Sequence, residues 1–114
     1  MEKDDQTIMV IERRNLFDDN DYFKEGFRPK ESSDFEARIL KHFEWMRRGN
    51  AEVDTGYKQP IAYAMIVNPE LEKVFAYQRA AKKEHYHDER LWGNWSVGVG
   101  GHIEKEDVHS GNPI

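Results

Sequence analysis

The chain has 114 residues, of which 38% are hydrophobic and 12% aromatic, and this suits one domain with a core of its own. Its formal net charge of −5 argues against generic binding to a nucleic-acid backbone, because that binding needs a basic surface. It has no cysteine, no apolar run that could span a bilayer and no apolar signal segment, so we expect a cytoplasmic protein without disulfide bonds, thiolate zinc sites or a membrane partner.

The first part of the chain, residues 1–31, predicts a strand followed by an arm. Residues 7–11 (TIMVI) are β-branched and apolar, which is typical of a short strand. Residues 13–31 are polar with scattered aromatic side chains. We expect this aromatic-rich arm to pack on the body of the domain or on a partner chain.

A helix is predicted over residues 32–49. Ser33 and Glu36 have the spacing of a capping box, and Gly49 can end the helix. The expected apolar stripe of this helix, which we assign to the core, consists of Phe35, Ile39, Leu40, Phe43 and Met46.

Residues 61–104 predict a hairpin and a further strand that ends in a glycine turn. Residues 61–67 (IAYAMIV) are almost wholly apolar, as in a strand that is covered on both faces. Residues 73–79 return after the turn that Asn68-Pro69 begins, and residues 95–103 form the last strand. The order of elements predicts an α/β (α+β) fold with a mixed sheet and helices against it.

Three sequence features, in this order, resemble the Nudix hydrolases. The first is KVFAYQRA, a strand with an arginine near its end, and the second is the strand that Trp95 opens. The third is GGHIE (100–104), which is similar to the start of the Nudix box. That box continues with a glutamate and then with acidic residues on a helix. The resemblance implies an incomplete Nudix-like α/β/α sandwich.

The resemblance also implies an activity, a cofactor and a site. Enzymes of this family are metal-dependent pyrophosphatases that cleave a nucleoside diphosphate linked to another moiety, with Mg²⁺ or Mn²⁺ stabilising the phosphoryl oxygens and activating water. The implied metal contacts are Gly100, Gly101 and Glu104, and the implied substrate contacts are Arg79, Trp95 and His102. Glycines at such a bend let the backbone approach a ligand closely.

The sequence departs from the family pattern after Glu104. If Gly101 is the first glycine of the box, the box glutamate falls on Asp107, with Glu106 beside it. Asn112-Pro113 is a good helix start, yet the acidic helix itself is missing. We therefore expect a domain truncated before its catalytic helix. It would be inactive alone, and its uncovered apolar surface would favour a homodimer or a marginally stable monomer.

Two alternative functions remain open. A non-catalytic nucleotide-binding or protein-interaction module could have the same fold. Isomerisation of an allylic diphosphate ranks low, because such enzymes typically use a cysteine and this chain has none.

Two further groups of side chains have both a site and an ordinary interpretation. His85, His87 and Asp88 could form a metal cluster, although a solvated loop is the simpler interpretation. Trp92 and Trp95 could stack on a base or pack in a core.

Overall fold

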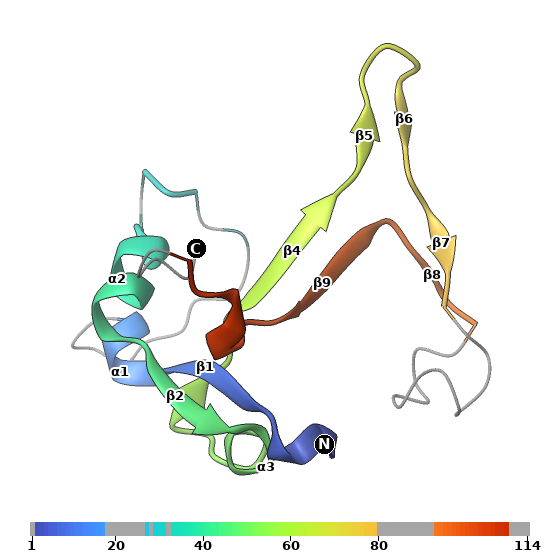
Figure 1. Ribbon diagram of the computed structural model, residues 1–114. Helices are drawn as coiled ribbons and strands as arrows, with labels where there is room; N and C mark the ends of the chain where they lie inside the picture. The colour runs from blue at the N-terminus through green and yellow to red at the C-terminus, as the bar shows by residue number, and fades with distance from the viewer. Residues whose placement is uncertain (1, 18–26, 28, 32, 80–92, 110–114) are drawn as a thin grey trace. The chain divides into compact units, whose positions relative to one another are not determined.

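The computed structural model describes residues 2–17, 27, 29–31, 33–79 and 93–109, which form helices and strands of an α+β chain (Figure 1). The chain divides into unit 1, residues 1–61 and 102–114, and unit 2, residues 62–101. In the described part of the chain, no helix is long and apolar enough to cross a membrane. The predicted features at His85, His87, Asp88, Trp92 and Asn112-Pro113 lie outside the described residues.

Unit 1 is built around the strand β1 (Thr7–Glu12), as the apolar pattern of residues 7–11 predicts. β1 is the middle strand of a three-stranded sheet and pairs antiparallel with β2 (Glu44–Arg47) and with β3 (Tyr57–Lys58). Ile8 stands opposite Met46 on one edge and bridges to Glu104 on the other edge. The N–H of Met9 donates to the carbonyl of Ile103 at 2.8 Å, so residues 103–104 extend the edge that β3 occupies.

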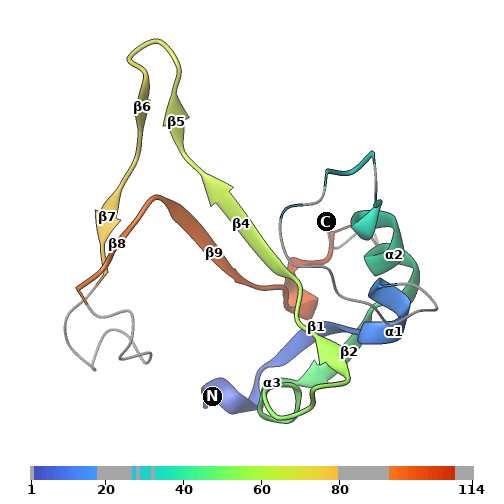
Figure 2. The same cartoon turned by 180° about the vertical axis from the view of Figure 1, so that it is seen from behind.

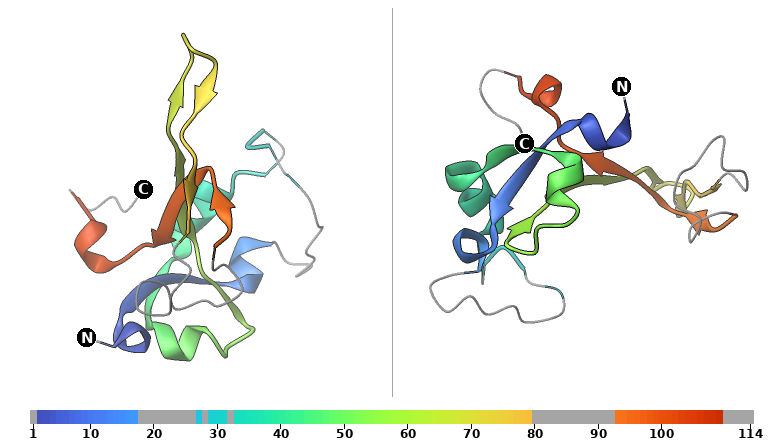
Figure 3. Two further views of the ribbon diagram at one scale, coloured as in Figure 1. Left: turned by 90° about the vertical axis from the view of Figure 1, so that its right-hand side faces the viewer. Right: turned by 90° about the horizontal axis from the view of Figure 1, so that it is seen from below.

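The core of unit 1 lies on β1. Ile8, Met9, Val10 and Ile11 have no exposed surface, and successive residues of a strand point to opposite faces, so β1 is covered on both sides. It contacts β2, β3 and the short helices α1 (Arg13–Leu16) and α3 (Arg48–Ala51), and Figures 2 and 3 show it between these elements. Met46, Tyr57 and Ala51 pack with Ile8 and Val10.

The predicted helix over 32–49 is wrong in its second half. The helix α2 covers Phe35–His42 only, and its N-cap is Asp34, whose carboxylate accepts from the N–H of Ala37 at 3.0 Å, in place of Ser33. The next residues form β2, because pairing with β1 outweighs the helical periodicity. Of the expected stripe, Met46 reaches the core from β2, whereas Leu40 is exposed.

A core truncation tests the central place of β1. We expect Ile8→Ala to lower the free energy of unfolding of the chain by about 2–5 kcal/mol, because it leaves a cavity at a fully buried position. Val53→Ala is the control, since Val53 is 82% exposed, and its effect should stay below about 0.5 kcal/mol. Urea denaturation followed by circular dichroism measures both values, and equal effects would contradict the assignment of the core.

In its described residues, unit 2 consists of three pairs of strands. β4 (Ile61–Met65) pairs with β9 (Gly98–His102), and β5 (Val67–Asn68) pairs with β6 (Lys73–Val74). β7 (Tyr77–Gln78) pairs with β8 (Trp95–Ser96), as Figure 1 shows. The hairpin predicted from residues 61–67 and 73–79 therefore exists, but only β5 and β6 pair within it.

The turn of this hairpin has the expected asparagine at its start. The side-chain oxygen of Asn68 accepts from the N–H of Leu71 at 3.1 Å, and the N–H of Glu72 donates to the carbonyl of Pro69 at 3.3 Å. Glu72 adopts a φ of 51°, which closes the turn at a residue other than glycine. The expectation that residues 61–67 are covered on both faces is wrong, because every residue of β4 and β5 is exposed.

Gly98 of unit 2 lies against a tyrosine ring. A Cβ atom at this position would overlap the ring of Tyr63, so only glycine lets the ring lie against the backbone. The carbonyl of Gly98 also accepts from the hydroxyl of Tyr77 at 2.9 Å and from that of Ser96 at 3.1 Å. Gly98 thus joins three neighbouring strands of this unit.

Alanine substitution at two glycines of β9 separates a packed position from an open one. We expect Gly98→Ala to displace the Tyr63 ring and to destabilise unit 2 by about 1–3 kcal/mol through overpacking. Gly101→Ala is the matched control, because a Cβ there meets no described atom within 4 Å. Amide hydrogen exchange of residues 62–79 measures the difference, and no change in Gly98→Ala would show that the ring moves aside freely.

Candidate functional site

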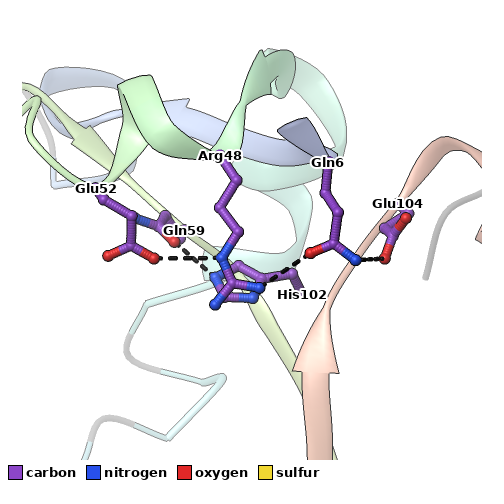
Figure 4. A network of polar contacts seen from close by, with 6 residues as sticks. All are labelled: Gln6, Arg48, Glu52, Gln59, His102 and Glu104. Atoms are coloured by element: carbon purple, nitrogen blue, oxygen red, sulfur yellow. Dashed lines mark hydrogen bonds and ion pairs between the residues drawn. The ribbon is translucent and has the colours of Figure 1, made fainter. Parts of the chain in front are cut away.

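The six predicted site residues are divided between the two units. His102 and Glu104 belong to unit 1, and the other four belong to unit 2. Within unit 1 the structure brings His102 and Glu104 into one neighbourhood of polar side chains, drawn in Figure 4. This polar network consists of Gln6, Arg48, Glu52, Gln59, His102 and Glu104.

Glu104 caps the 3₁₀ turn η3 (Lys105–Asp107) and is fixed by two donors. Its carboxylate accepts from Nε2 of Gln6 at 3.2 Å and from the backbone N–H of Asp107. In return, the carboxylate of Asp107 accepts from the N–H of Glu104 at 2.8 Å, which completes a capping box. The carboxylate of Asp107, the expected counterpart of the box glutamate, therefore stabilises the turn by accepting this hydrogen bond.

Arg48 determines how Gln6 faces Glu104. The Nη1 atom of Arg48 donates to Oε1 of Gln6 at 3.1 Å, and its Nε atom donates to Glu52 at 3.4 Å. Because Arg48 can only donate, the oxygen of the Gln6 amide faces Arg48 and the NH₂ group faces Glu104. Figure 4 shows this chain of contacts running from Glu52 through Arg48 and Gln6 to Glu104.

His102 supplies the imidazole of the polar network. Its Nε2 atom lies 2.6 Å from Oε1 of Gln59. Burial lowers the pKa of His102 below its ordinary value of 6.5, and the charges of Arg48 and Lys3 lower it further against an opposing effect of Glu52. The imidazole is therefore held in its neutral form at neutral pH.

The described residues do not by themselves fit a divalent cation. Nowhere in the described ranges do three or more His, Asp or Glu side chains gather in a group that could hold a metal ion. Of the two carboxylates in the polar network, Glu52 pairs with Arg48 and Glu104 meets N–H donors. Hard cations take several oxygen ligands, so further ligands would have to come from outside the described residues.

Arg79 and Trp95 both lie at the β7–β8 pair of unit 2, with their side chains on opposite faces of the pair. The backbone N–H of Arg79 donates to the carbonyl of Asn94 at 2.8 Å, and its guanidinium donates to the hydroxyl of Ser96 at 3.4 Å. Trp95 stands opposite Gln78 in the ladder and is 71% exposed. Trp95 shares a face with Gln78, whereas Arg79, the residue after Gln78, points to the face of Ser96. The guanidinium could contact a phosphate and the exposed indole an aromatic ring, each on its own face.

Gly100 and Gly101 lie in the strand β9 and not in a tight bend. Gly101 has no positive φ and no described atom that a Cβ would meet, so its expected role in a close backbone approach has no support in unit 2. The glycine that does allow a close approach is Gly98, three positions earlier, which the sequence analysis did not single out.

Sequence reasoning also missed four members of the polar network, namely Gln6, Arg48, Glu52 and Gln59. Arg48 and Glu52 have the i,i+4 spacing of a helical ion pair, which was a usable signal. Gln6 and Glu104 are 98 positions apart in the sequence, and no local sequence pattern predicts a contact between such distant residues.

Comparison with curated proteins finds a relative of this chain. The chain is 34% identical over 105 residues to Protein YmaB of Bacillus subtilis (strain 168). The alignment covers 90% of this chain and 48% of the Bacillus protein, so the chain spans about half the length of this curated relative. No family model matches the sequence, and no solved structure matches it.

The lowered pKa of His102 makes the stability of unit 1 depend on pH. Because the folded-state pKa lies below 6.5, the unfolded chain binds a proton more readily, and stability falls as pH drops through 6.5 toward the folded-state pKa. We expect the free energy of unfolding to decrease from about pH 8 to about pH 5 and His102→Gln to reduce this slope. Urea titrations at each pH measure it, and an NMR-titrated imidazole pKa above 6.5 would contradict it.

Proposed function

We propose that this chain supplies part of a hydrolase domain similar to the Nudix hydrolases, which cleaves a nucleoside diphosphate linked to another moiety. The incomplete α/β/α sandwich and the cytoplasmic location belong to the same proposal. The observation that carries it is the placement of Glu104. This carboxylate follows the glycine-rich β9 in the chain and is held by donors from Gln6, which precedes β1, and from η3.

The donors give Glu104 a fixed position before any ligand arrives. Arg48 orients Gln6, and Gln6 in turn holds one carboxylate oxygen of Glu104. Functional groups gain from such preorganisation, because little reorganisation is then needed during the reaction. Mg²⁺ or Mn²⁺ remains an expectation for a complete domain, since the described residues do not supply its ligands.

Substrate contacts are proposed for Arg79 and Trp95. The Arg79 guanidinium can hydrogen-bond a phosphate oxygen in addition to its neighbour Ser96, and the exposed indole of Trp95 offers a stacking face for a base. His102, in unit 1, is a separate candidate contact and would act as a neutral donor or acceptor. Arg79 and Trp95 are therefore two separate candidate contacts, one for a phosphate group and one for a base.

Calorimetric titration of the chain with ADP-ribose in the presence of Mg²⁺ tests the substrate class. We expect binding that Arg79→Ala and Trp95→Ala each weaken by about fivefold or more, which corresponds to about 1 kcal/mol. Lys73→Ala is the matched control, because Lys73 is an exposed cation on a strand of the same unit. Binding that is absent, or that is weakened equally by the control, would contradict these assignments.

Hydrolysis is tested after the chain is joined to the part of the Bacillus protein that it does not match. We expect Mg²⁺-dependent release of nucleoside monophosphate from a panel of diphosphate derivatives, reduced about tenfold or more by Glu104→Gln. Glu70→Gln, in the exposed hairpin turn, should leave the rate unchanged. A folded protein that turns over no member of the panel would refute the hydrolase.

A non-catalytic nucleotide-binding module is the second candidate function. It is favoured by the fact that both carboxylates of the polar network already have partners within unit 1. Tight binding of ADP-ribose without turnover in the two experiments above would select this candidate.

A further inference from the structure

We propose that the paired strands β4 and β9 of unit 2 are a docking surface for a polypeptide that covers both of their faces. The occupant is a segment equivalent to the part of Protein YmaB that this chain does not match. This inference does not depend on the proposed hydrolase activity, because it rests on apolar exposure and on chain length alone.

One face of the β4–β9 pair is apolar and open. Ile61, Tyr63 and Met65 alternate along β4 and therefore point to the same side, and Tyr63 and Met65 are 60% and 57% exposed. The ring of Tyr63 lies on Gly98 of β9, which places the glycine backbone on this same face. Gly98 has no side chain to cover this face, and the residues before and after it in the chain point to the opposite face.

The opposite face is apolar and open as well. Val99 follows Gly98 in β9 and therefore points away from Tyr63, and it is 52% exposed. Ala62 and Ala64 alternate with Tyr63 and share this second face, where both are exposed. Strands with apolar residues on both faces are typical of sheets that carry a layer of structure on each side.

The backbone edges of the pair are also available within the described residues. β4 and β9 form a two-stranded sheet, so each strand has one edge with no strand partner in the described part of the chain. Exposed edges of this kind accept a further strand readily. An added polypeptide can therefore satisfy the edge groups and cover the apolar side chains together.

A second copy of the chain explains this surface less well than a different polypeptide. A two-fold contact between copies joins one patch to its own equivalent, which would cover one face and leave the other open. The Bacillus protein contains a length of chain beyond the match that is similar to the matched length, since the match covers 48% of it. A segment of that size can form layers on both sides of a two-stranded sheet.

Mixing the full chain with the separately produced, unmatched part of the Bacillus protein tests the docking. We expect a one-to-one complex in sedimentation, and amide exchange in residues 61–67 and 97–101 that is slower by about tenfold or more. A homodimer of the chain alone that slows exchange in the same residues would overturn the proposal, as would the absence of a complex.

Variants on the two faces test whether both are covered. Met65→Lys on one face and Val99→Lys on the other should each weaken the complex by about tenfold or more, because each buries a charge against the partner. Val53→Lys, at an 82% exposed valine of unit 1, should bind as the unchanged chain does. An effect of only one face variant, or an equal effect of Val53→Lys, would refute a partner that covers both faces.

A single joined polypeptide keeps the test decisive if the separate part of the Bacillus protein is insoluble. In it, this chain replaces the matched 105 residues of Protein YmaB. Slower exchange in β4 and β9 of the joined protein than in the chain alone would support the proposal. Unchanged exchange in a joined protein whose β1 amides are protected would overturn it.

Discussion

The burial of one strand on both faces and both edges is the constraint on which unit 1 depends. β1 has no exposed residue from Ile8 to Ile11, so it can exist only if neighbours supply side chains above and below it and backbone partners along it. β2 takes one edge, and β3 and residues 103–104 share the other. Segments from three distant parts of the sequence therefore meet at this strand.

The polar network follows from that meeting. Gln6 directly precedes β1, Arg48 directly follows β2, and Glu104 bridges to β1, so pairing of the strands brings the three side chains within hydrogen-bonding distance. The backbone N–H of Arg48 also donates to the carbonyl of Gln6 at 2.7 Å. The orientation of the Glu104 carboxylate is thus a consequence of sheet register more than of any feature of the GGHIE motif itself.

Strands and turns that depend on a local sequence pattern could be predicted from the sequence. Elements and contacts that depend on the pairing of distant strands could not. The apolar run at residues 7–11 is a strand, as expected, and the asparagine-proline step begins a turn. Residues 44–47 continue a helical periodicity but form β2, because partners on β1 are available only in the folded chain. The contacts of Tyr63 with Gly98 and of Gln6 with Glu104 join residues far apart, so no window of sequence contains them.

The pairing of β1 with residues 103–104 has a consequence for biosynthesis. The N–H of Met9 cannot reach its acceptor until Ile103 has left the ribosome, so one edge of the first strand stays without its final partner while the intervening chain is made. Contacts of such long sequence separation slow folding, and open strand edges favour aggregation during the delay.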